Sequence, residues 1–150
     1  MAILRDRPYS NCNFLVDFDD GKAWHTTGGF SEVIFPPFVI AAGARRATSR
    51  SKKTPPVLPP APYNPHLILR RGVIGSLDLY TWWNKARQGK APARRAARIH
   101  LLGDDHRTTV MSWHFSNVRP VLLAYSPLQA NEPGVLIETL EIAFDRMEMQ

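Results

Sequence analysis

The second half of the chain is a succession of short strand-like segments interrupted by one helical pattern. Apolar, β-branched and aromatic residues dominate each of these segments, and Gly, Pro, Asp and Asn residues separate them. The segments cover residues 66–71, 96–102, 108–115, 118–125 and 135–148. This pattern predicts a mainly β protein with one flanking helix, and we find no internal repeat.

The helical pattern covers residues 76–88. Apolar side chains recur there at helical spacing and form one face, at Leu79, Trp82, Trp83 and Ala86. We expect Ser76 to be the N-cap and Asp78 to lie in the first turn, where the helix dipole favours an acid. Gly89 stands at the expected stop. Since the two adjacent tryptophans cannot face the same way, we expect one of them to anchor the helix against the sheet.

The order of the segments suggests local pairings. Residues 14–19 and 28–35 also have strand patterns. The turn signal between them suggests that they pair as neighbours. The two strand patterns within residues 96–116 predict a hairpin with its turn at Gly103 to His106. Pro120 interrupts the short strand 118–125, and residues 135–148 predict one long last strand.

Most of the chain's 13 prolines lie between residues 36 and 65. Proline fixes φ and lacks an N–H donor, so regular sheet cannot run through this stretch. We expect a basic, Pro-rich extended loop within a single domain spanning residues 1–150. A loop of this length is functional or else disordered until bound. Its cations are candidate assembly contacts, and they are Arg45, Arg46, Arg50, Lys52 and Lys53.

Size and charge limit the classes of protein further. A length of 150 residues suits one domain, and no apolar run approaches the roughly 20 residues of a membrane helix. The N-terminus lacks the apolar core of a signal peptide, so we expect cytoplasmic synthesis and no membrane anchor. The net charge of +6 is uneven. A second basic group follows the helix, and it comprises Arg87, Lys90, Arg94, Arg95 and Arg98.

This charge pattern has two interpretations. The stretch 132–148 is mostly acidic, so basic and acidic regions of different copies can attract one another. The same basic excess would also bind nucleic acid, and exposed aromatic residues would stack on single-stranded bases. A small basic nucleic-acid-binding module is therefore the alternative hypothesis. Its candidate aromatic residues are Trp82, Trp83, Trp113 and Phe115, although a place in the core explains them better.

The residues offer little for catalysis or for a cofactor. The histidines have no metal-ligand spacing, although His100 and His114 lie on opposing strands of the predicted hairpin. Cys12 is the only cysteine, and we interpret it as structural. Gly72 and Gly75 precede a helix but lack the other residues of a phosphate-binding loop. We expect no enzyme, no metal site and no cofactor.

Three blocks together resemble the tail tube proteins of contractile phages and of bacterial contractile injection systems. The first block comprises residues 8–16 and 28–33, which are close to the family's opening strands. The second comprises residues 67–72 and 76–84, similar to the family's LKRG strand and aromatic helix. The third runs through residues 95–143. Their order and spacing carry the resemblance.

The resemblance implies a β-sandwich or barrel-like domain of two packed antiparallel sheets with one flanking helix. It implies homohexameric rings that stack into an inner tube, with sheath, baseplate and neighbouring tube proteins as partners. DNA or a protein payload would pass through the channel without any catalysis. The acidic contacts that we expect for the basic loop of a neighbouring copy are Glu138 and Glu141.

The sequence departs from the family in its middle. The family usually continues its GFSEV strand with SGL and a strand of alternating acids, whereas residues 34–38 read Ile-Phe-Pro-Pro-Phe here and lead into the basic, Pro-rich stretch. This departure is consistent with a subunit at the baseplate end of the tube or with a variant of the main tube protein.

Overall fold

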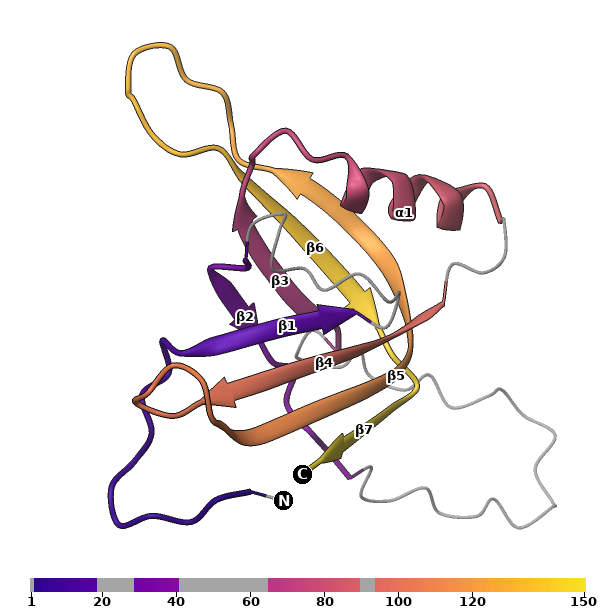
Figure 1. Ribbon diagram of the computed structural model, residues 1–150. Helices are drawn as coiled ribbons and strands as arrows, with labels where there is room; N and C mark the ends of the chain where they lie inside the picture. Colours follow the sequence, from indigo (N-terminus) through magenta and orange to yellow (C-terminus); the bar gives the residue numbers. More distant parts are fainter. Residues whose placement is uncertain (1, 19–28, 41–64, 90–93) are drawn as a thin grey trace, which may run out of the picture.

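The computed structural model describes residues 2–18, 29–40, 65–89 and 94–150. These residues contain seven antiparallel strands and one helix (Figure 1). The strand order is β1-β4-β5-β6-β3-β2, and β7 also pairs with β5. The elements are β1 (Phe14–Phe18), β2 (Glu32–Ile34), β3 (Leu67–Gly72), α1 (Asp78–Arg87), β4 (Arg95–Leu102), β5 (Thr109–Tyr125), β6 (Ile137–Ala143) and β7 (Arg146–Met149).

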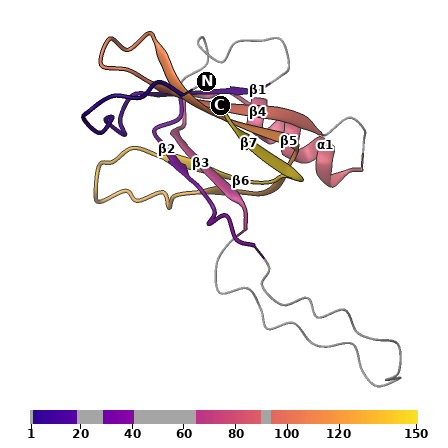
Figure 2. The same cartoon turned by 90° about the horizontal axis from the view of Figure 1, so that it is seen from below.

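The long strand β5 joins two layers (Figure 2). Its first part pairs with β4 and β7, and with β1 these form sheet A. Its last part, residues 119–125, pairs with β6, and with β3 and β2 these form sheet B. The prediction of two packed antiparallel sheets with one flanking helix is confirmed.

The predicted break at Pro120 is wrong, because β5 continues through it. The register between β5 and β6 shifts between Pro120 and Leu122, and such an irregularity accommodates a residue that has no N–H. Asn117 adopts a positive φ of 54° just before this point. The strand therefore bends at residues 116–120 instead of ending there.

The single last strand is also wrong, since β6 and β7 are separate strands. Both run along β5, with Ala143 opposite Arg119 and Arg146 opposite Ser116. The interruption coincides with the bend of β5, where the Asp145 N–H donates to the Ser116 carbonyl at 3.1 Å. The C-terminal segment thus follows β5 from one sheet into the other.

The suggested pairing of the first two strands is wrong as well. β1 pairs with β4, and β2 pairs with β3, which places β1 and β2 at opposite ends of the strand order. The inward residues of β1 face those of β4, as in the pairs Val16–Ile99 and Phe18–Ala97. Apolar alternation fixes which face of a strand is buried, but it does not select the partner strand.

The helix begins at Asp78, and its N-cap, Leu77, lies one residue later than expected and has no side-chain cap bond. The Ser76 hydroxyl donates to Asp78 Oδ1 at 2.5 Å, and its Oγ accepts from the Asp78 N–H at 3.4 Å. Asp78 lies in the first turn, as predicted. The predicted stop is confirmed, because Gly89 has a φ of 69° and donates its N–H to the Ala86 carbonyl.

Trp82 anchors the helix in the core, as the sequence predicts for one of the two tryptophans. Its side chain is 1% exposed, and its ring meets Phe18 edge to face with 5.2 Å between centroids. Trp83 stays partly exposed beside Tyr80. Other core residues come from both sheets and include Leu67, Leu69, Ile99, Phe115, Leu140 and Ile142.

A buried cation joins the helix to sheet B. The Arg71 guanidinium on β3 donates Nε to Glu138 Oε1 on the adjacent strand β6. Its Nη2 donates to Asp78 Oδ1 of α1 at 2.6 Å. Arg71 and Glu138 are almost completely buried, and Asp78 is partly exposed. We call these residues the Arg71 triad.

The Asp78 carboxylate is charged at neutral pH. Burial raises its pKa, but the hydrogen bonds from Arg71 and Ser76 and the charge of Arg71 outweigh this effect, and the net pKa lies below the usual value. Because the folded pKa is depressed, this contact stabilises the fold above the unfolded pKa of about 4. The contribution is lost as the pH falls through the folded pKa.

The triad yields a stability prediction. Glu138→Ala removes the buried acceptor of Arg71 Nε and leaves that donor unpaired beside a cavity, so unfolding should become easier by about 3 kcal/mol. Glu141→Ala is the matched control on the opposite face of β6, where Glu141 contacts His66, and should cost about 1 kcal/mol or less. Urea denaturation would measure both. Equal midpoints for the two variants would contradict the role of the triad.

Candidate functional site

Sheet B has two open edges. β2 ends the strand order on one side, and residues 119–125 of β5 pair only with β6. Within the described part of the chain, no strand pairs with the outer side of either segment. An open edge presents unpaired N–H and C=O groups and is a template for pairing with another chain. The two edges lie on opposite sides of the same sheet.

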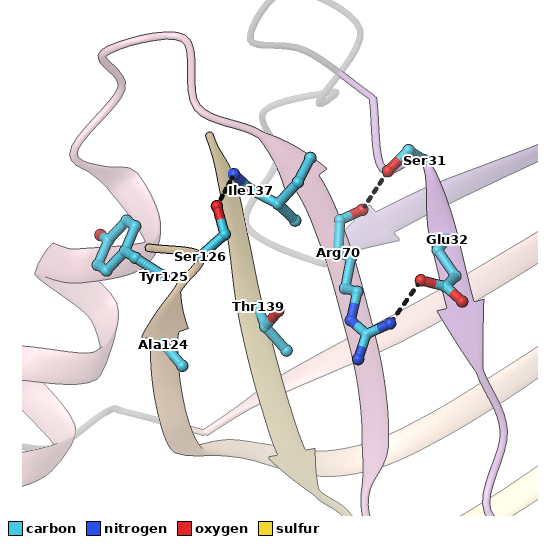
Figure 3. A pocket seen from close by; sticks show the side chains of 8 residues that line it. All are labelled: Ser31, Glu32, Arg70, Ala124, Tyr125, Ser126, Ile137 and Thr139. Carbon is cyan, nitrogen blue, oxygen red and sulfur yellow. Dashed lines mark hydrogen bonds and ion pairs between the residues drawn. The ribbon is translucent and has the colours of Figure 1, made fainter. Parts of the chain in front are cut away.

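The outer face of sheet B, turned away from the core, carries few unpaired charges. Ala124, Thr139, Arg70 and Glu32 follow one another across its four strands. Arg70 Nη1 donates to Glu32 Oε2 at 2.9 Å, so the two charges offset each other. These side chains line an open hollow of about 420 Å³ together with Ser31, Tyr125, Ser126 and Ile137 (Figure 3). Nothing in this lining suggests a reaction centre.

The two ends of sheet B carry exposed apolar residues. The β5–β6 loop, residues 126–136, projects from one end, and its Leu128 is 86% exposed (Figure 1). Residues 35–40 leave β2 at the other end, where Ile40 is 92% exposed. Because β2 and β5 run in opposite directions across the sheet, these segments lie at opposite ends of it. Both segments expose apolar surface that could contact a partner.

The predicted contact residues divide into two groups. The basic residues Arg45, Arg46, Arg50, Lys52 and Lys53 lie outside the described residues. Glu138 is 3% exposed and belongs to the Arg71 triad within the chain. Glu141 lies on the outer face of sheet B, within 3.3 Å of His66 Nδ1. The structure therefore gives both acids partners within the same chain.

The histidines do not form a metal centre in the described residues. No group of three or more His, Cys, Asp or Glu side chains there is arranged to hold a metal ion. The rings of His100 and His114 do come close, with 6.5 Å between centroids, and Ser112 Oγ lies 2.8 Å from His100 Nδ1. Burial lowers the pKa of His100. His25 lies outside the described residues, and Cys12 is exposed.

The aromatic residues do not form the stacking platform of the alternative hypothesis. Trp82 and Phe115 are buried in the core. Trp113 packs on Phe35, with 4.9 Å between ring centroids. Stacking of single-stranded bases needs exposed ring faces, which these residues do not offer together. The described part of the chain also contains no helix long and apolar enough to cross a membrane.

Solved structures of contractile injection systems share this fold. A chain of the sheath–tube complex of the extracellular contractile injection system PVC is 22% identical, with a TM-score of 0.69 over 97% of this chain and 93% of that one. A chain of the anti-feeding prophage baseplate is 21% identical, with a TM-score of 0.67 and 97% of each chain covered. Hcp1 from Flavobacterium johnsoniae is 15% identical, with a TM-score of 0.56 over 91% and 93% of the two chains.

The sequence itself matches a family model over nearly its whole length. A comparison with curated proteins finds no match. The family model of the T4-like virus tail tube protein gp19 matches residues 10–148. This range includes every strand up to β6, the helix and most of β7. The chain therefore belongs to the T4-like virus tail tube protein gp19 family.

Proposed function

We propose that the chain is a structural, non-enzymatic subunit of the inner tube of a contractile tail or injection system. Six copies form a ring, and rings stack around a channel. The observation that carries this proposal is the pair of open edges of sheet B, in a chain of the tail tube family. The baseplate of the anti-feeding prophage, which contains a chain of similar fold, is six-fold symmetrised.

The ring closes by strand addition. The β2 edge of one copy pairs with residues 119–125 of the next copy, and the pairing is antiparallel because the two strands run in opposite directions. Repetition around the ring turns six B sheets into one barrel without open edges. Sheet A and α1 occupy the core side of sheet B. The outer face of sheet B therefore lines the channel, and its Arg70–Glu32 pair carries no net charge.

Stacking uses the two ends of sheet B. When one face of a ring binds the opposite face of the next ring, each added ring is shifted along the ring axis. Such a contact never closes on itself, so the rings form an open stack. The loop 126–136 of one ring would meet the opposite face of the next ring. Its exposed Leu128 and Val135 then become buried.

The assembled tube has further partners. Sheath subunits surround it, and baseplate or neighbouring tube proteins contact its ends. DNA or a protein payload passes through the channel when the tube enters the target envelope. Subunits assemble in the cytoplasm and remain part of the particle. Both a main tube subunit and a baseplate-end subunit fit this proposal. The alternative, a nucleic-acid-binding module, has no support from the family or the fold.

The basic stretch that includes Arg45, Arg46, Arg50, Lys52 and Lys53 serves as a contact arm to an acidic surface of a neighbouring ring, the sheath or the baseplate. Glu141 of a neighbouring copy is a candidate partner, although it contacts His66 of its own chain. Glu138, which was also expected to be a contact, is buried in the Arg71 triad and is not accessible to the arm.

Deletion of residues 44–54 tests this arm. The deletion should leave the unfolding midpoint unchanged, because residues 44–54 contain no large apolar side chain. It should shorten or abolish tubes in electron micrographs. Tubes of normal length from the deletion variant would show that the stretch is only a surface loop.

Purified protein provides the test of the whole proposal. Light scattering coupled to size exclusion should report a mass of six chains or a multiple of it, and negative-stain images should show rings or tubes. A monomer that stays single at high micromolar concentration, and that shifts DNA in a salt-sensitive manner, would instead favour the nucleic-acid-binding module.

A further inference from the structure

The loop 126–136 contains a single charged residue, Glu132. The residue is exposed, and no described residue forms an ion pair with it. The loop projects beyond the end of sheet B (Figure 1). An exposed acid in a projecting loop, without an ion-pair partner among the described residues, can thus meet a cation on another molecule.

The opposite end of sheet B presents an oriented guanidinium. Arg119 lies at the bend of β5, opposite Ala143, the last residue of β6. Its Nη1 donates to Asp145 Oδ1 at 2.9 Å, and Asn117 Nδ2 donates to Asp145 Oδ2 at 3.1 Å. The Asp145 N–H bonds to the Ser116 carbonyl, which ties the acid to the backbone of β5. Asp145 therefore holds the Arg119 side chain in place.

Arg119 retains donors for a second carboxylate. Its side chain is 42% exposed, and within the described residues only Nη1 has a hydrogen-bond partner. Arg94 is close enough for its charge to act on Asp145, and Arg146 follows Asp145 in the chain. The three arginines outnumber the two acids that pair with them, Asp145 and Glu148. We call this group the Arg119 corner. Its net charge is positive, and a guanidinium fork suits a carboxylate.

We propose that Glu132 of one copy pairs with the Arg119 corner of a copy in the adjacent ring, an inference that rests on the proposed stacking of rings. The loop and the corner lie at opposite ends of the same segment, residues 119–125 (Figure 1). In the proposed ring the loop therefore lies on one ring face and the corner on the other. Stacking brings the loops of one ring toward the corners of the next.

Charge reversal and its rescue test this contact. Glu132→Arg and Arg119→Glu should each weaken ring–ring association about tenfold or more, because like charges then face each other. The double variant Glu132→Arg/Arg119→Glu should regain tube length, because the pair is restored with its polarity exchanged. Asp6→Arg and Arg107→Glu are matched controls at exposed sites elsewhere and should stack normally. Tube length in negative-stain images and the salt concentration that separates rings would be measured.

The outcomes separate the contact from the proposed function. Wild-type stacks that persist in both single variants, or single defects that the double variant does not rescue, would overturn the Glu132–Arg119 pairing and leave the tube assignment intact. Absence of rings and stacks in the wild type would contradict the tube assignment itself. Thermal unfolding of each variant shows whether a loss of stacking is caused by misfolding. If misfolding were the cause, the double variant would not restore stacking.

Discussion

The buried guanidinium of Arg71 determines how the helix and sheet B fit together. It is neutralised by Glu138 on the neighbouring strand and by Asp78 at the start of α1. A buried charge is tolerated only when its partners are in place, so the helix can dock in one position. That position brings Trp82 into the core and keeps α1 on the core side of sheet B. The outer face and both edges of the sheet thereby remain open for other copies.

Local patterns predicted most of the helix and strand positions, whereas the continuity of β5, the division of the last strand and the long-range pairing lay beyond them. The spacing of Leu79 and Trp82 indicated the helix, and alternation indicated the strands. The partners of β1 and β2, and the passage of β5 through Pro120, depend on residues far apart in the sequence. Turn residues and prolines indicate only the local backbone conformation. A bulge or a bend allows a strand to continue where a proline predicts a break. The family resemblance provided the two-sheet architecture that local patterns could not.

In the candidate site, too, the sequence indicated some features and not others. Glu138 was expected to be a contact for the basic loop of a neighbouring copy, but it alternates in phase with the buried Leu140 and Ile142. Arg71 likewise follows Leu67 and Leu69 at intervals of two. Phase along a strand would have placed both charged residues in the core and indicated that they pair. No sequence signal located the Arg119 corner, because it assembles residues from β5 and the β6–β7 connection.

In the proposed ring, copies join edge to edge through sheet B. Electron cryomicroscopy of the assembled particle tests it most directly, because the map would show the strands on each side of a subunit boundary. We expect an antiparallel pairing of β2 with residues 119–125 of the next copy, and a continuous barrel whose channel face carries Arg70 and Glu32. Rings that join through sheet A or α1, with both edges of sheet B left unpaired, would contradict it.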